Sequence, residues 1–168
     1  MKLQKLFEMQ KLLDKRIIKE HGLEAVNLLE EKLLALQVEI AELANETRCF
    51  KYWSNKEASP KERILDEYVD GLHLFLSICL LLKMTDIKID SDYTEVTTVK
   101  TFNRLFQWVS DLSQTSICFP NYLKNDVEMC FNLFIGLGEK HLGFTWEEIE
   151  QAYIEKNEVN HQRQDNGY

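Results

Sequence analysis

Residues 64–83 read ILDEYVDGLHLFLSICLLLK, and this stretch decides the fold. Its apolar side chains point to nearly every side of a helix, which is typical of a helix buried at the centre of a domain. The run from Leu72 to Leu82 is too short to cross a bilayer, because a spanning helix needs about 20 apolar residues. The stretch therefore predicts a central helix from about Pro60 to Lys83, with other helices packed around it.

Five further helices are expected on either side of this one. Helical spacing of apolar residues predicts them over about 3–20, 24–46, 96–112, 122–141 and from residue 145 onward. Ser59 is expected to cap the central helix, and Thr145 with Glu148 forms a capping-box pattern at the start of the last helix. Glycine and proline are scarce, with 6 and 2 residues respectively. We therefore predict an all-α bundle of about six helices that forms one domain over residues 1–168.

The composition argues against several classes of protein. The net charge is −8 and the pI about 5.1, whereas a sequence-independent nucleic-acid binder needs a basic surface. The four cysteines lack metal-binding spacing and indicate free thiols, with Cys79 and Cys130 buried. The charged, amphipathic first residues are unlike a signal peptide. We expect a soluble, cytoplasmic protein with no nucleic-acid or membrane partner.

Two acidic pairs carry the strongest chemical signal. Glu39 and Glu42 lie in LQVEIAELANE, residues 36–46, and Glu67 and Asp70 lie in the central stretch. Residues three apart share a helix face, and the apolar neighbours bring both faces close to the core. Two carboxylates about 4 Å apart repel by about 4 kcal/mol at an effective dielectric near 20, so a cation between them is expected. Mg²⁺ prefers such oxygen ligands, with Mn²⁺ as an alternative ion, and the pairs therefore predict a metal site for phosphate chemistry.

Two polar segments supply cations and hydrogen-bond donors that suit a phosphate chain. The connection between the acidic helices interleaves cations and aromatic residues: Arg48, Phe50, Lys51, Tyr52, Trp53, Lys56 and Lys61. The last residues, YIEKNEVNHQRQDNGY (153–168), hold mostly donors: Lys156, Asn157, Asn160, His161, Arg163 and Gln164. On composition alone, a solvated loop and a frayed chain end remain alternative interpretations.

Other chemistries have weaker support. Asp70 and His73 form an acid-x-x-His pair like those of di-iron carboxylate bundles, but such bundles need this motif on two helices and it occurs here once. The chain has no nucleophile elbow and no glycine-rich phosphate loop. Hydrolysis by a metal-positioned water is therefore the favoured reaction. The alternative from another class is a helical binding or regulatory protein without catalysis, whose acidic faces are simply solvated.

The chain resembles the all-α nucleotide pyrophosphatases, the superfamily that includes MazG, and within it the dimeric-type dUTP diphosphatases. Five segments match in order: MQKLLD (9–14), LQVEIAELANE (36–46), FKYW (50–53), DEYVDGLHL (66–74) and the terminal residues 153–168. The resemblance implies Mg²⁺-dependent hydrolysis of dUTP to dUMP and pyrophosphate, with dUDP also a substrate, by a homodimer. The apolar faces of FNRLFQWVSDL (102–112) are expected to supply the dimer interface. A pyrophosphatase for another nucleotide, such as dCTP or a modified nucleotide, stays open.

The resemblance also implies roles for particular residues. Glu39, Glu42, Glu67 and Asp70 would bind the metal, and Glu39 or Glu42 would also orient the attacking water. Gln10 matches a position that hydrogen-bonds uracil. The other implied substrate contacts are Asp14, Lys51, Trp53, Lys56, His73, Leu74, Lys156, Asn157, Asn160, Arg163 and Tyr168, with residues 155–168 closing over the substrate. Two of these depart from the family, which often has Asn at the position of Asp14 and Phe at that of Leu74. Because the family's Phe is thought to lie under the deoxyribose, Leu74 leads us to expect weaker discrimination against UTP.

Overall fold

The computed structural model describes residues 3–167. Within this range the chain forms six α-helices and one π-helical turn, and it has no strand. They are α1 (Gln4–Glu20), α2 (Leu29–Thr47), α3 (Lys61–Leu81), α4 (Thr98–Cys118), α5 (Leu123–Gly136), the π-helical turn η1 (Leu137–His141) and α6 (Trp146–Asp165). The predicted all-α bundle is confirmed. Among these helices, none has the length and the apolar run that crossing a bilayer requires.

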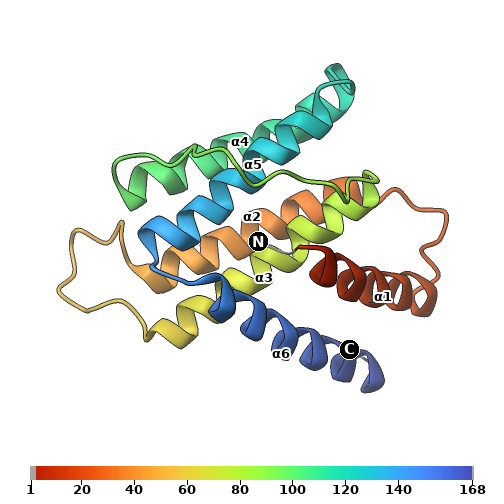
Figure 1. Ribbon diagram of the computed structural model, residues 1–168, viewed down its shortest axis with the longest axis horizontal. Coiled ribbons are helices and arrows are strands. Elements are labelled where there is room, and N and C mark those ends of the chain that lie inside the picture. The colour runs from red at the N-terminus through yellow and green to blue at the C-terminus, as the bar shows by residue number, and fades with distance from the viewer. Residues whose placement is uncertain (1–2, 168) are drawn as a thin grey trace.

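Helix α3 lies at the centre of the bundle, as its sequence predicted. Helix α2 runs antiparallel to it and makes the most extensive contact with it (Figure 1). Helices α4 and α5 pack together on one side of this pair, and α1 and α6 pack against α3 from the other side (Figure 1). Helices α1, α2, α3 and α6 can therefore bring side chains together at one place.

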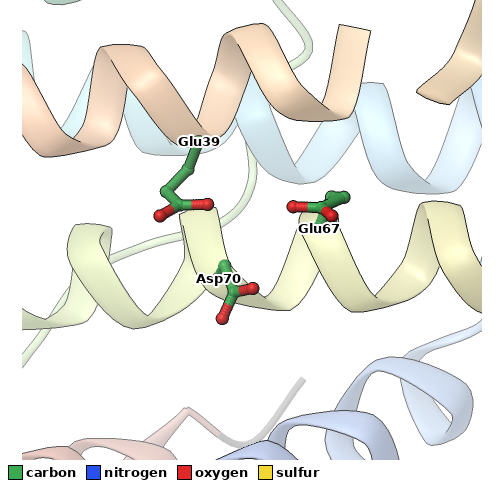
Figure 2. A group of neighbouring side chains, drawn as sticks. All are labelled: Glu39, Glu67 and Asp70. Atoms are coloured by element: carbon green, nitrogen blue, oxygen red, sulfur yellow. The ribbon is translucent and has the colours of Figure 1, made fainter. Parts of the chain in front are cut away.

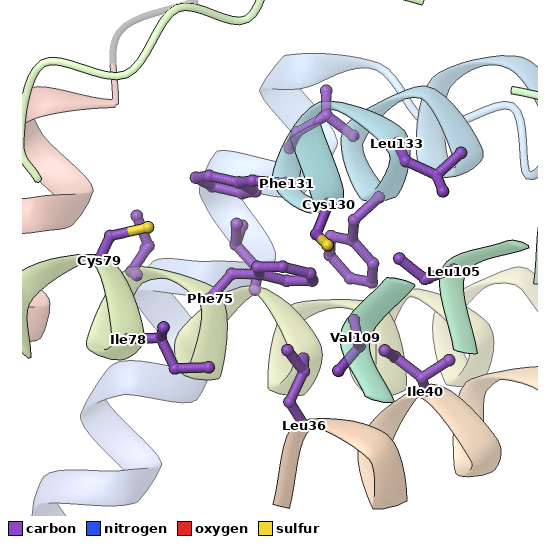
Figure 3. Close-up of a cluster of buried hydrophobic side chains, with 14 of the residues drawn as sticks. Leu36, Ile40, Phe75, Ile78, Cys79, Leu105, Val109, Cys130, Phe131 and Leu133 are labelled. Atoms are coloured by element: carbon purple, nitrogen blue, oxygen red, sulfur yellow. The ribbon is translucent and has the colours of Figure 1, made fainter. Parts of the chain in front are cut away.

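The hydrophobic core lies where α2, α3, α4 and α5 meet (Figure 3). Ile40 of α2 and Val109 of α4 are fully buried there, and the rings of Phe75 and Phe131 stack with their centroids 5.2 Å apart. Full burial of each such side chain contributes about 1.5–3 kcal/mol relative to exposure. This core holds α2 and α3 in a fixed register, which in turn fixes the acidic residues on their other faces.

The two cysteines predicted to be buried and free are so in the structure. Cys79 on α3 and Cys130 on α5 are buried thiols without a disulfide. Burial raises the pKa of both thiols, so they behave as small apolar side chains of the core.

Two helix boundaries differ from their predictions. Helix α2 begins at Leu29 rather than near residue 24, because the Asn27 side chain accepts a hydrogen bond from the Leu29 amide at 3.3 Å and starts the helix there. Helix α4 continues past Leu112 to Cys118. Its polar last turns stay helical, and the Ser116 hydroxyl bonds back to a carbonyl of the preceding turn at 2.7 Å.

The predicted cap of α3 is wrong, whereas that of α6 is confirmed. Pro60 is the N-cap residue of α3, and no side chain caps it. The Ser59 hydroxyl donates instead to the Glu46 carboxylate, so it ties the loop after α2 back onto the end of that helix. Thr145 and Glu148 form the expected capping box of α6.

The segment expected to supply a dimer interface lies in the core of its own chain. Four apolar residues of FNRLFQWVSDL are buried there: Phe102, Leu105, Val109 and Leu112. The face that these four residues form is directed at α2 and α5 of the same chain, and a contact of the rest of the segment with a second subunit stays a prediction. The large apolar side chains that α2, α4 and the following loop do expose are Leu34, Val38, Ile117, Phe119 and Tyr122.

Gly138 allows η1 to lie directly against α3. A Cβ atom at position 138 would lie 2.5 Å from Cζ of Tyr68, which is itself fully buried and stacked on Phe134. Gly138→Ala should therefore lower the free energy of unfolding by about 1–3 kcal/mol, measured by urea denaturation. Gly136→Ala is the control, because its Cβ would meet the Thr94 methyl group in an irregular segment that can shift. Equal losses in the two variants would contradict this account.

Candidate active site

Three carboxylates from the two central helices converge on one point. Glu39 on α2 points toward α3, on which Glu67 and Asp70 lie one turn apart (Figure 2). One oxygen of each lies within 4.8 Å of the others. An all-oxygen donor set of this kind suits a hard divalent cation. The structure thus brings together three of the four residues that the sequence nominated as metal ligands.

Glu42, the fourth nominated ligand, lies outside this group of three. It is exposed on the next turn of α2, yet its charge contributes to raising the pKa of Glu39 and of Glu67. Its part in binding a metal stays a prediction.

Burial and neighbouring negative charges raise the pKa values of the three clustered carboxyl groups. Burial is the largest cause for Glu39, followed by the charges of Asp70, Glu42 and Glu67, and together they raise its pKa from 4.5 to about 7. Burial also raises the pKa of Glu67 and of Asp70. The site therefore stores electrostatic repulsion that a bound cation would relieve.

Two cations of the chain balance part of this negative charge. Lys156 on α6 reaches α3, where its ammonium lies 2.6 Å from Asp70 and 3.0 Å from Asp66. Arg63 pairs with Glu67 and, at 3.2 Å, with Asp66. The sequence reasoning missed Arg63 and Asp66, although Arg63 lies four residues before Glu67 and this spacing favours a pair on one helix face. A metal at this place has to compete with Lys156 for Asp70.

Glu39→Gln should raise the melting temperature of the protein near and above neutral pH when divalent cations are chelated. The folded-state pKa of about 7 lies above the unfolded value of 4.5, so between these values the folded state binds the proton more tightly. Stability therefore falls as pH rises from about 4.5 through about 7, and removing the ionisable group removes that fall. Melting curves in EDTA across this range test it, with Glu57→Gln in the exposed loop as control. Parallel pH profiles for Glu39→Gln and wild type would contradict the assignment.

A cavity of about 300 Å³ adjoins the carboxylates. Glu39 and Asp70 form part of its wall, and the wall comes from α1, α2, α3 and α6. The wall includes six further residues that the sequence nominated: Gln10, Asp14, His73, Leu74, Asn160 and Arg163. Ligand cavities of proteins begin at about this volume, so the site has room for a small polar molecule beside the carboxylates.

A buried polar network forms part of the wall of this cavity. The Gln10 amide group donates to Asp14 at 2.7 Å, and its oxygen accepts a hydrogen bond from the Tyr153 hydroxyl at 2.6 Å. The same oxygen lies 2.7 Å from Nδ1 of His73, whose ring stacks on Tyr153 with centroids 4.0 Å apart. Burial, with a smaller effect of Lys156, lowers the pKa of His73 to about 3, so this imidazole is neutral at pH 7.

The other ring nitrogen of His73, Nε2, is without a hydrogen-bond partner in the described part of the chain. This atom is buried, although His73 is on the cavity wall. A buried polar atom without a partner is costly, and native proteins retain few of them outside functional sites. This nitrogen is therefore a candidate contact for a ligand.

Sequence reasoning also missed Lys32 and Ser77, which complete the network behind Asp14. The Lys32 ammonium lies 3.7 Å from Asp14 and donates to the Ser77 hydroxyl, which donates to Asp14 at 2.5 Å. A weak signal was present: Lys32 precedes Glu39 by seven positions and Ser77 follows Asp70 by seven. Seven residues are two helical turns, so each lies on the same face as an acidic residue.

The basic, aromatic loop is not brought to this cavity. Lys51 donates to Asn45, Trp53 contacts Phe50 and Tyr52, and Lys56 is exposed. Trp53 itself is 64% exposed, and the loop extends beyond the end of the bundle (Figure 1). Substrate contacts by Lys51, Trp53 and Lys56 stay predictions.

The nominated residues of the C-terminal segment have mixed positions. Asn160 and Arg163 lie on the cavity wall, 3.2 Å apart between side-chain oxygen and guanidinium nitrogen, and Lys156 reaches the acidic cluster. Asn157 is buried, and its Nδ2 has no partner among the described residues. Tyr168 lies outside the described residues.

Comparison with known proteins agrees with this arrangement. A search of curated proteins finds no match. A protein-family model described as dUTPase, however, matches residues 2–168. The match spans nearly the whole chain, including the acidic cluster, the cavity and the polar network. The chain therefore belongs to the all-α dUTPase family and is an enzyme that hydrolyses dUTP.

Proposed function

We propose that the chain hydrolyses dUTP to dUMP and pyrophosphate with Mg²⁺ held by Glu39, Glu67 and Asp70, and that dUDP is a further substrate. One observation carries this proposal. A single cavity has on its wall both the carboxylates of Glu39 and Asp70 and the polar groups of Gln10 and His73 that are proposed to bind the base. A nucleotide placed there has its phosphates at the acidic end and its base at the polar network.

The donor atoms of the cluster fit the proposed metal. Its ligands are carboxylate oxygens, which Mg²⁺ and Mn²⁺ prefer, and nitrogen or sulfur donors are absent from the group of three. When bound there, Mg²⁺ would neutralise phosphate charge and lower the pKa of a water molecule. We assign the exposed Glu42 to the solvent side of the same site, where it adds negative charge.

The chain's own residues perform the other parts of the reaction in this proposal. Glu39 is on the cavity wall beside the proposed phosphate position, where its carboxylate can orient the attacking water and accept a proton from it. Arg163 and Asn160 on α6 present donors to phosphate oxygens. Residues 155–168 are the proposed closing segment, because α6 carries these donors and Lys156 to the site.

Recognition of the nucleoside is proposed at the polar network in the cavity wall. Gln10 supplies an N–H and His73 supplies its unpartnered Nε2 to the edge of uracil. Leu74, half-buried on the wall, lies against the deoxyribose, where a 2′-hydroxyl would be buried without a partner. Such burial costs about 1–3 kcal/mol, so UTP is expected to be a poorer substrate by about fivefold to 150-fold.

A homodimer is proposed to be the working form of the protein. What supports it is a groove between α2 and α4, lined by Leu34 and Ile117, which are 64% and 77% exposed. Phe119 and Tyr122 extend this apolar surface from the end of α4. Light scattering during gel filtration should give the mass of two chains, and Ile117→Asp should give the mass of one.

A nucleotide panel tests the proposed reaction. Purified protein is incubated with dUTP, dUDP, dCTP, dTTP or UTP, with Mg²⁺, with Mn²⁺ or with EDTA, and the products are separated by ion-exchange chromatography. The proposal requires dUTP to have the highest kcat/KM, to yield dUMP and pyrophosphate, and to need the metal. The same assay is run on Glu39→Gln, which changes a proposed metal ligand, and on Glu57→Gln, an exposed loop residue that serves as its control. A preference for dCTP, or release of inorganic phosphate from dUTP, would refute it.

A further inference from the structure

Six side chains from four helices form one hydrogen-bonded network along the cavity wall. Lys32 of α2 donates to Ser77 of α3, and Ser77 donates to Asp14 of α1 at 2.5 Å. Gln10 of α1 donates to the other oxygen of Asp14 at 2.7 Å, and His73 of α3 lies 2.7 Å from the Gln10 oxygen. Tyr153 of α6 donates to that same oxygen at 2.6 Å.

The two charged members of this hydrogen-bonded network, Lys32 and Asp14, fix the direction of every hydrogen bond in it. An ammonium group can only donate and a carboxylate can only accept, so Ser77 must pass its proton toward Asp14. The Gln10 atom beside Asp14 must then be its nitrogen, which leaves the amide oxygen facing His73. An amide oxygen only accepts, so Nδ1 of His73 must carry the proton.

The neutral imidazole therefore has a bare lone pair at Nε2. This atom is the one that is buried without a partner among residues 3–167, and it belongs to a residue of the cavity wall. His73 itself is only 6% exposed. The position accepts a hydrogen bond from a ligand and repels a second lone pair.

We propose that Asp14, fixed by Lys32 and Ser77, is a positioning residue that acts through Gln10 to hold His73 in the Nδ1–H tautomer, so that the cavity selects a base with an N–H group. This inference rests on the proposed function. It gives Asp14 a role other than the substrate contact expected from the sequence, and it gives Lys32 and Ser77 a role that the sequence did not indicate.

The selectivity follows from the edges of the two pyrimidines. Uracil presents an N3–H donor beside a carbonyl oxygen, which complements the Nε2 acceptor of His73 and the remaining N–H of Gln10. Cytosine held in the same place presents the lone pair of its N3 to the lone pair of Nε2. A buried mismatch of this kind costs about 1–3 kcal/mol, which is roughly a fivefold to 150-fold preference for uracil.

The tautomer can be measured directly and without substrate. In protein labelled with ¹⁵N-histidine, the His73 signals are assigned by their loss in His73→Gln. Two-bond nitrogen–proton correlation spectra at pH 7 should show a pyrrole-type Nδ1 and a pyridine-type Nε2 in the wild type. A pyrrole-type Nε2, or a doubly protonated ring, would overturn the proposal. Failure of the proposed function is seen separately, as absent dUTP hydrolysis.

Variants at Asp14 test whether Asp14 sets the tautomer of His73 through Gln10. Asp14→Leu removes the acceptor that orients Gln10, so Nε2 should move toward the pyrrole type and the ratio of kcat/KM for dUTP over dCTP should fall about tenfold or more. Asp14→Asn keeps an acceptor oxygen and should retain the ratio within about threefold. Asp126→Leu is the matched control, because Asp126 is also half-buried and bonded to a hydroxyl, on α5. An unchanged His73 spectrum in Asp14→Leu would overturn the proposal, and the wild-type spectrum decides the tautomer even if that variant does not fold.

Discussion

Replacing Asp70 with Asn should reduce kcat/KM for dUTP at saturating Mg²⁺ about a hundredfold to a thousandfold. Asp70 contributes one of three oxygens that lie within 4.8 Å of one another, and it also lies on the wall of the substrate cavity. A metal in such a site supplies several kcal/mol of transition-state stabilisation, and each 1.36 kcal/mol is about tenfold in rate. Steady-state release of pyrophosphate measures the loss, and calorimetric titration with Mn²⁺ measures the accompanying loss of metal affinity.

The control for this variant is Asp126→Asn on α5. Asp126 is half-buried and bonded to Thr115, but it is not on the wall of the cavity that Glu39 and Asp70 share. Its rate should stay close to that of the wild type, with the same Mn²⁺ affinity. If Asp70→Asn turned over dUTP at the wild-type rate, the proposed role of the acidic cluster in catalysis would be wrong.

Replacing Lys156 with Met should have opposite effects on metal binding and on catalysis. The Lys156 side chain is 11% exposed and lies between Asp70 and Asp66, so its removal takes away the cation that is ion-paired with both carboxylates. Removing one partner of a fully buried pair costs 3–5 kcal/mol, and the partial exposure of both carboxylates reduces this to about 1–3 kcal/mol. The melting temperature in EDTA should therefore fall by about 3–10 °C.

Addition of Mg²⁺ should distinguish this account of Lys156 from a purely structural one. The metal takes the place of the missing ammonium at Asp70, so Mg²⁺ should raise the melting temperature of Lys156→Met more than that of the wild type. Metal affinity should rise in the variant while kcat/KM for dUTP falls, since Lys156 is one of the C-terminal cations expected to contact the phosphate chain. Lys5→Met, which breaks an exposed pair with Glu150 of α6, is the control. If Mg²⁺ did not restore the melting temperature of Lys156→Met, the proposal that Lys156 and the metal compete for Asp70 would be wrong.

The fold followed from local sequence because its decisive features are local. Residues 64–83 are apolar on nearly every side, which is a property of one helix alone, and they form the central α3. The same locality explains the acidic cluster, since three-residue spacing puts Glu67 and Asp70 on one face. Local spacing does not determine which residue of the α2 pair, Glu39 or Glu42, faces α3. Glu39 turns toward α3 and Glu42 toward solvent, because the packing angle of α2 decides between them.

The parts that sequence reasoning missed depend on contacts between helices. Lys32, Ser77 and Asp14 meet only because α1, α2 and α3 pack in a particular register, for which spacing on any one helix gives no direct signal. The direction of the loop over 48–60 could not be predicted for a related reason. Its aromatic residues pack on one another, Trp53 against Phe50 and Tyr52, so the loop bends away from the site rather than over it. Side-chain chemistry alone did not determine that direction.

A crystal structure with Mg²⁺ and the non-hydrolysable analogue α,β-imido-dUTP tests the central claim most directly, namely that one cavity holds metal, phosphates and base. The account predicts metal density among Glu39, Glu67 and Asp70, with Lys156 displaced from Asp70. It also predicts the N3–H of uracil within hydrogen-bond distance of Nε2 of His73. Uracil bound elsewhere with Nε2 still unpartnered, or phosphates held without a metal at these carboxylates, would contradict it.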